Sequence, residues 1–247
     1  MEVHAHPHTA RKKWTHYLWE FLMLFLAVFC GFLAENFREH QVEHQREKRY
    51  IASLVKDVEL DIASLKQSSD IRKKYITYFD SLVYLLKNYH DSNLSVIYFY
   101  ARHAGRIINF KYHDGTILQL KSSGSLRLIR NKDAVDSIIV YDNEVIKTIL
   151  NQQEIYEPRF RNDIVTNYFG KIFNAYEWDA MIDDTAAISR TVNNPKLFNN
   201  DPKLINDFVV QIITIKTTYR ITNGYIEKAI HSAERLVAFL QKEYHLE

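Results

Sequence analysis

The chain has 247 residues, of which 32 are basic and 30 acidic, and a formal net charge of +2. Because the two signs are interspersed, the sequence lacks the basic stripe typical of nucleic-acid binding, and nucleic acid is not expected as a partner. Only six Gly and four Pro interrupt long stretches of helical periodicity, so the composition favours an all-α fold.

Residues 1–13 are predicted to be a polar tail. Its alternating histidines, His4, His6 and His8, could lie on one side of an extended segment. They do not complete a tetrahedral ligand set, and no metal or other cofactor is expected for this chain. The single cysteine, Cys30, excludes an internal disulfide and is interpreted as a small apolar residue.

The first strongly apolar stretch, residues 17–34, contains Glu20 as its only charged residue. As a helix this stretch is about 27 Å long, close to the thickness of the hydrocarbon core of a bilayer. Trp14, Tyr17 and Trp19 cluster at one end, where aromatic rings favour the headgroup region. Residues 14–35 are therefore predicted to be a transmembrane helix surrounded by a lipid bilayer. A buried core helix and a cleaved signal peptide are the alternatives.

Cleavage by a signal peptidase requires small residues at positions −3 and −1 of the site. A cut after Ala34 would place Phe32 at −3, and a cut after Phe29 would place that bulky residue at −1. Phe29 is also unsuitable before the cysteine of a lipoprotein signal. The helix is therefore expected to remain attached to the chain.

Residues 36–50 have no Gly or Pro and carry Glu at four-residue steps among basic residues, which is typical of a solvated helical stalk. From Ile51 the apolar residues step by four and three, and the same register resumes at Ile76. One helix is therefore predicted from the membrane to about Tyr89, with residues 67–70 as the place for a bend. Residues 51–247 are expected to form one helical bundle domain.

Asp57 and Asp61 lie one helical turn apart on this predicted helix. Two carboxylates can serve acid–base or metal chemistry, but no residue nearby in the sequence completes such a site. A solvated helix face or an internal salt bridge is therefore expected for both.

The middle of the chain is predicted to contain short helices. A turn at 90–93 precedes a helix at about 96–100, and Asp114 is a candidate N-cap for the next helix. Gly124 is expected to end that helix in the left-handed conformation, with Leu126 making the accompanying apolar contact. Asn131 is then a candidate N-cap for a helix over 132–153.

The residues after Gly124 are expected to lie in the core or at the surface according to their polarity. The apolar ones are expected in the core: Leu126, Leu128 and Ile129. Arg127 and Arg130 would then find water or carboxylates, and Asp57 and Asp61 are the acidic residues expected opposite them. A flexible surface loop is the alternative for this stretch.

Several stretches combine in a way that resembles a family of uncharacterised single-pass bacterial membrane proteins with a domain of unknown function. They are Trp19-Glu20-Phe21, Gly31, residues 35–39, the set Tyr50, Leu54, Asp57 and Asp61, and residues 120–131, which begin Leu-Lys-Ser-Ser-Gly. The resemblance covers most of the chain, is most specific at Leu-Lys-Ser-Ser-Gly, and implies an envelope location without catalytic residues. Together with Arg11, Lys12 and Lys13 before the span, it favours the bacterial inner membrane, a cytoplasmic N-terminus and a periplasmic domain.

The last third of the chain is predicted to contain two helices. The first covers residues 160–191 after Pro158, and its aromatic stripe is assigned to the core rather than to a ligand site. A loop at 193–200 leads to Asp201-Pro202, a strong helix start. From there a 4–3 apolar repeat crosses Asn223-Gly224 unbroken, which predicts one helix over 202–244. This helix should pair with the helix that leaves the membrane as its antiparallel partner in an elongated bundle, with the shorter helices alongside.

Catalytic motifs are absent from the sequence in any complete form. Ser53-x-x-Lys56 and Lys216-Thr-Thr only partly match the penicillin-binding pattern, which also needs a sheet. The sequence therefore favours a non-enzymatic, membrane-anchored helical interaction or scaffold protein with a protein partner or self-association. A sensory domain that relays a signal through the membrane helix, and an enzyme of unrecognised type, are the alternatives.

Overall fold

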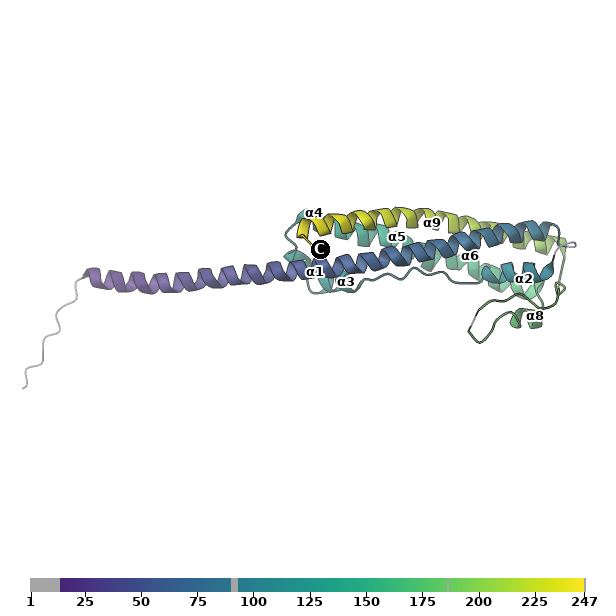
Figure 1. The fold of residues 1–247 in the computed structure, drawn as a ribbon, viewed down its shortest axis with the longest axis horizontal. Helices are drawn as coiled ribbons and strands as arrows, with labels where there is room; N and C mark the ends of the chain where they lie inside the picture. The colour runs from purple at the N-terminus through teal and green to yellow at the C-terminus, as the bar shows by residue number, and fades with distance from the viewer. Residues whose placement is uncertain (1–13, 90–92, 186, 247) are drawn as a thin grey trace, which may run out of the picture. The chain divides into compact units, whose positions relative to one another are not determined.

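The computed structural model describes residues 14–89, 93–185 and 187–246 of the chain (Figure 1). The chain divides into two compact units, Met1–Arg49 and Tyr50–Glu247. Helix α1 (Trp14–Lys87) contributes residues to both units. The histidines and basic residues assigned to the tail, and most of the predicted turn at 90–93, lie outside the described residues.

In the first unit, the described residues are entirely helical and belong to α1. The helix contains a segment that is long and apolar enough to cross a membrane, and none of that segment is buried. Its phenylalanines are exposed and stack one turn apart, with ring centroids 6.3 Å apart for Phe21 and Phe25 and 5.9 Å for Phe25 and Phe29. Arg38 follows the apolar segment and donates to Glu35 at 2.9 Å. The prediction of one continuous helix from the apolar segment to about Tyr89 is confirmed, since α1 runs without interruption to Lys87.

The second unit is built from helices, and no strand occurs in the described part of the chain, where Ile182 and Ile188 form only an isolated bridge. The all-α prediction is confirmed. After α1 the elements are α2 (Leu94–His103), α3 (Gly115–Ser122), the 3₁₀ turn η1 (Ser125–Leu128), α4 (Lys132–Val140), η2 (Tyr141–Ile146), α5 (Lys147–Asn151), η3 (Gln152–Tyr156), α6 (Glu157–Ile164), η4 (Val165–Phe169), α7 (Gly170–Ile172), α8 (Ala175–Asp179) and α9 (Pro202–Tyr244).

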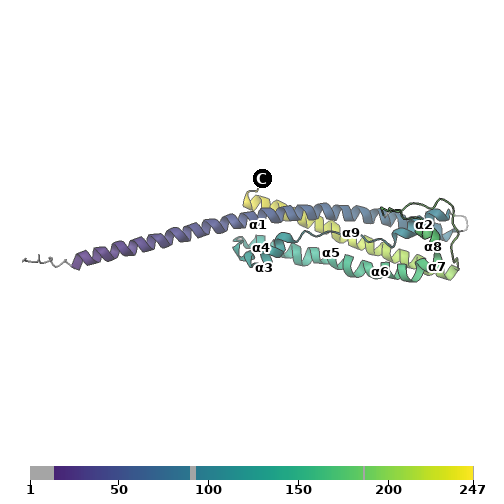
Figure 2. The same cartoon turned by 90° about the horizontal axis from the view of Figure 1, so that it is seen from below.

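Within this unit, α1 and α9 lie side by side and run in opposite directions, as Figures 1 and 2 both show. Side-chain contacts join the two helices at intervals, and partners with higher residue numbers on α1 have lower residue numbers on α9. The pairs are Glu59 with Gln241, Lys66 with Glu234, Lys73 with Glu227, and Asp80 with Arg220 and Lys216. The predicted antiparallel pair is confirmed, including the uninterrupted passage of α9 through Asn223 and Gly224.

The third long element of the bundle is the helical run 132–172, from α4 to α7. It packs against α9 through α4, α5 and α6 and passes through the π-helical turns η2, η3 and η4. Asn131 caps the run as predicted, because its side chain accepts from Ala134 N at 3.1 Å. Pro158, after which the 160–191 helix was predicted to start, lies in the first turn of α6 directly after η3.

The bundle has two apolar cores. The first includes Ile51 and Leu65 of α1 and Ile226 and Leu240 of α9. The second includes Phe79 and Leu86 of α1 and Phe208 and Tyr219 of α9. Between the two cores, α1 buries polar side chains instead, and so does α9: Ser68, Ser69, Arg72, Thr222 and Asn223. We call this set, together with Glu157 of α6, the polar layer.

The prediction of a helix over 160–191 is wrong after Ile172. Phe173 has extended dihedral angles, and Asn174 caps α8 by accepting from Tyr176 N at 3.0 Å. This cap competes with the continuing aromatic periodicity and ends the run. The predicted loop at 193–200 and the helix start are confirmed, since Asp201 accepts from Leu204 N at 2.9 Å.

Candidate functional site

The most unusual feature of the bundle is the extended chain between α2 and α3, residues 106–114, which we call the return segment. It carries no helix or strand, so its backbone N–H and C=O groups need other partners. Side chains of α1 supply several of these partners. The bonds are Arg72 Nη2 to Ile108 O at 3.0 Å, Lys111 N to Ser64 Oγ at 2.9 Å, His113 N to Asp61 Oδ1 at 2.8 Å and, one residue into α3, Thr116 N to Asp57 Oδ2 at 3.0 Å.

These bonds fix the direction of the return segment, because the bonding partner on α1 changes from Arg72 to Asp61 as the segment advances from Ile108 to His113. The segment therefore runs antiparallel to α1. On its other side, Gln153 of η3 binds both backbone groups of Phe110, accepting from N at 2.8 Å and donating to O at 3.2 Å. The segment is thus held between α1 and the helical run 132–172.

Asp57 caps α3 from outside that helix. Its carboxylate accepts from Thr116 N, which is one of the first N–H groups of α3 and has no partner within the helix. Asp114 was the predicted N-cap, and it does occupy the position before Gly115, but its side chain makes no capping bond. The physical reason is that the carboxylate of Asp57 on α1 already accepts from the Thr116 N–H, so a side-chain bond from Asp114 is not needed.

Asp61 is fully buried and has a partner on each carboxylate oxygen. Oδ1 accepts from His113 N and lies 3.0 Å from His113 Nδ1, and Oδ2 accepts from Tyr141 Oη at 2.9 Å. Burial raises the pKa of Asp61, and the bonds from His113 and Tyr141 oppose that shift. The pKa of Tyr141 is also raised, first by burial and then by the charge of Asp61. Asp61 therefore joins α1, the return segment and η2.

The expectation that Asp57 and Asp61 lie opposite Arg127 and Arg130 is wrong. Both arginines are exposed, while the two carboxylates bind backbone and side-chain groups of the return segment, α3 and η2. Backbone N–H groups that folding removes from water need acceptors more than arginines that reach solvent do. The carboxylates consequently face the segment rather than the surface.

Gly124 adopts the left-handed conformation, with φ 67° and ψ 15°, directly after the C-cap Ser123. Its N–H donates to Lys121 O at 3.3 Å, one of the bonds typical of this kind of helix end. Leu126 is half-buried and packs against the first core, Leu128 is half-buried, and Ile129 is buried. This stretch is therefore an ordered helix end.

Replacing Gly124 with Val should lower the melting temperature of the protein. A β-branched residue at positive φ costs roughly 1–2 kcal/mol, which corresponds to about 2–8 °C for a domain of this size. Leu126→Ala should act in the same direction because it removes apolar contact. Gly115→Ala is the matched control, since a Cβ there meets no atom within 4 Å and φ is not positive. Circular dichroism measures the melting temperatures. If Gly124→Val melted at the same temperature as the wild type, the assignment of Gly124 as a left-handed helix end would be contradicted.

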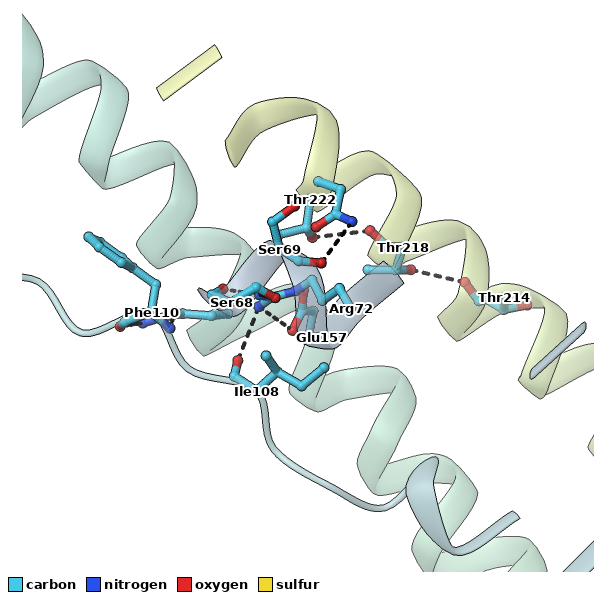
Figure 3. A network of polar contacts seen from close by, with 11 residues as sticks. Ser68, Ser69, Arg72, Ile108, Phe110, Glu157, Thr214, Thr218 and Thr222 are labelled. Atoms are coloured by element: carbon cyan, nitrogen blue, oxygen red, sulfur yellow. Dashed lines mark hydrogen bonds and ion pairs between the residues drawn. The ribbon is translucent and has the colours of Figure 1, made fainter. Parts of the chain in front are cut away.

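Arg72 is the centre of the polar layer, and Figure 3 shows it between α1, α6 and the return segment. Its side chain is fully buried and donates to Glu157 through Nε at 2.9 Å and Nη2 at 3.0 Å. Nη1 donates to the backbone and hydroxyl oxygens of Ser68, and Nη2 also reaches Ile108 O. All five N–H groups of the guanidinium therefore have acceptors, which is what burial of this charge requires.

The rest of the polar layer is less completely bonded. Asn223 Nδ2 donates to Ser69 O at 3.4 Å, but Asn223 Oδ1 and Ser69 Oγ have no partner within the described residues. Thr222 donates to Thr218 O, and Thr218, which lies next to the layer on α9, donates to Thr214 O, at 3.0 Å each (Figure 3). A buried layer of this kind penalises shifted pairings of α1 and α9, because a shift would place Arg72 in an apolar core.

Neither Arg72 nor Glu157 stands out in the sequence as important. The available signal was the pair of polar residues Ser69 and Arg72 at positions where the apolar register of α1 lapses. Nothing local in the sequence could have indicated the partner, because Glu157 lies 85 residues further along the chain.

The chemistry of these sites is structural. The carboxylates and the guanidinium bind protein groups that folding has removed from water, and no group of three or more His, Cys, Asp or Glu side chains in the described chain could hold a metal ion. Comparison with protein-family models, curated proteins and solved structures finds no match to the chain. The return segment and the polar layer thus hold the helices of the second unit together, as the contacts of Asp61 and Arg72 show.

Proposed function

We propose that this protein is a membrane-anchored helical interaction protein of the bacterial envelope. The observation that carries the proposal is the apolar segment of α1, which is long enough to cross a bilayer and has none of its residues buried. A core helix of a soluble protein would bury such a segment, whereas lipid would cover its exposed phenylalanines. The proposed role is to hold a rigid bundle at the membrane for a protein partner.

The proposed location is the inner membrane, with the N-terminus in the cytoplasm and the bundle in the periplasm. Arg11, Lys12 and Lys13 before the span support this orientation, as does the resemblance to single-pass bacterial membrane proteins. Protease added to spheroplasts should therefore digest the second unit while the membrane is intact. Protection of the bundle until the membrane is disrupted would reverse the orientation, and a mature N-terminus near residue 30 or 35 would contradict the anchor.

A surface on α9 supports an interaction role. Four apolar residues on the side of α9 away from the core are exposed at spacings of three, eight and four residues: Val210, Ile213, Ile221 and Tyr225. These spacings place them on one face of the helix, which we call the α9 stripe. Exposed apolar residues gathered on one face are typical of a surface that a partner helix covers.

The α9 stripe can be tested by crosslinking in cells. A photoreactive amino acid at Ile213 or Ile221 should produce a protein adduct in membranes, with twice the monomer mass for self-association and another mass for a different partner. The matched controls carry the same group at Asp136 and Asn151, which are exposed polar positions on α4 and α5. Equal adduct yields at stripe and control positions, or none at either, would contradict the proposal.

A further inference from the structure

A cavity of about 360 Å³ lies between α2, α7, α8 and the segment that leads into α9. This volume is at the lower end of the range for small-molecule sites. Four of the lining residues are aromatic, two are small and two are charged: Phe169, Phe173, Trp178 and Phe198, Gly170 and Ala175, and Arg102 and Asp179.

Hydrogen bonds tie the cavity walls together. Asn174 N donates to Tyr98 Oη at 2.8 Å, and Tyr98 Oη donates to Lys196 O at 3.0 Å. Phe198 N donates to Ile172 O at 2.9 Å. The π-helical turn η4 ends at Phe169, directly before Gly170, and such turns are frequent at functional sites. The α2 helix, the end of the helical run and the 196–198 segment are therefore fixed relative to one another around the cavity.

Arg102 provides the main polar group of the cavity. Its Nη1 donates to Trp178 O, and its Cζ lies 4.7 Å from the centroid of the Trp178 ring. Nε and Nη2 make no hydrogen bond within the described part of the protein. Partial burial lowers the pKa of Arg102, neighbouring Arg106 adds to this effect, and the negative charge of Asp179 opposes it. Among the described residues, Asp179 makes no hydrogen bond to Arg102, so an anionic group in the cavity could still bind the two remaining donor atoms, Nε and Nη2.

We propose that this cavity binds a small apolar monocarboxylic acid, with the carboxylate on Arg102 and the apolar part against Phe169, Phe173 and Trp178. Because Asp179 at the wall repels every ligand carboxylate, the cavity is expected to accept only the one carboxylate that Arg102 binds. This inference goes beyond the interaction role proposed above, since it concerns a small ligand and a different surface from the α9 stripe.

The probe is 3-phenylpropionate, titrated by calorimetry into the full-length protein in nanodiscs, with empty nanodiscs as the blank. Saturable binding with one site per chain is expected. The uncharged analogue 3-phenylpropanamide should bind about tenfold more weakly or worse, because it cannot form a charge-assisted pair with Arg102. The cationic analogue 3-phenylpropylamine should not bind.

Two variants locate the site. Gly170→Leu should abolish binding with an unchanged melting temperature, because a Cβ at Gly170 meets no atom within 4 Å and the larger side chain would occupy the cavity. Arg102→Gln should weaken binding of the acid about tenfold and remove the preference over the amide. Arg190→Gln is the matched control, since Arg190 lies over Phe99 and does not line the cavity. Absence of saturable binding, equal affinity for acid and amide, or unchanged binding in both variants would each overturn the proposal.

Discussion

Replacing Arg72 with Met is expected to destabilise the bundle severely. The substitution leaves the carboxylate of Glu157 buried without its counter-charge and removes five donated hydrogen bonds. Breaking a buried ion pair in this way costs about 3–5 kcal/mol, which corresponds to a fall in melting temperature of roughly 6–20 °C for a domain of this size. Differential scanning fluorimetry of the full-length protein in detergent measures the effect.

The double variant Arg72→Met/Glu157→Leu separates loss of the ion pair from loss of packing. Because both charges are removed, it should recover much of the stability that the single variant loses. Lys66→Met is the surface control, since its pair with Glu234 is about half exposed and such pairs contribute about 0–1 kcal/mol. A single variant that melts within about 2 °C of the wild type would show that Glu157 finds another partner or takes up a proton.

The long helices could be predicted from the sequence because their signals are local. Helix α9 has inward-facing residues at alternating steps of four and three from Phe208 to Leu240, nearly all of them apolar, and begins with Asp201-Pro202, so neighbouring residues alone define it. The antiparallel pairing with α1 followed from two amphipathic helices of similar length. By contrast, the end of the helical run at Ile172 depended on the Asn174 cap, which competes with an aromatic pattern that continues in the sequence.

The return segment could not be predicted, because its structure comes from partners distant in the sequence. Its backbone is bound by Arg72, Ser64 and Asp61, which precede their partners by 36 to 52 residues. In the sequence of α1 these polar residues only interrupt the apolar register or belong to a solvated face. Their role becomes visible when the position of the return segment is known. Asp57 and Asp61 were expected on a solvated face or in an internal salt bridge, because their spacing alone could not indicate that backbone N–H groups would be their partners.

Asp61→Asn is expected to lower the stability of the bundle by an amount that depends on pH. The amide NH₂ of Asn cannot accept a hydrogen bond, so either His113 N or Tyr141 Oη is left without its acceptor. An unsatisfied buried donor costs about 1–3 kcal/mol, or roughly 2–10 °C in melting temperature. The bonds of Asp61 to His113 and Tyr141 connect α1 with the return segment and with η2. Losing either bond should therefore lower the global stability of the bundle rather than cause local fraying.

The pH dependence follows from the raised pKa of Asp61. Burial makes the folded protein hold the Asp61 proton more tightly than the unfolded chain, whose carboxyl titrates at about pH 3.9. The stability that protonation contributes is therefore fully present below about pH 3.9 and is lost as pH rises through the folded pKa. Since Asn does not titrate, the stability difference between wild type and Asp61→Asn should widen as pH falls through this window.

The Tyr141→Phe variant separates the effect of burial on the pKa of Asp61 from the effect of its hydrogen bonds. The Tyr141 hydroxyl donates to the charged carboxylate and so lowers the pKa of Asp61, as does His113. Removing the hydroxyl should raise the pKa further and extend the window in which stability falls with pH to higher values. Urea unfolding at a series of pH values, with wild type, Asp61→Asn and Tyr141→Phe in parallel, measures these slopes. If the difference between wild type and Asp61→Asn widened with rising pH instead, the bonds from His113 and Tyr141 would outweigh burial, and Asp61 would be held as a carboxylate.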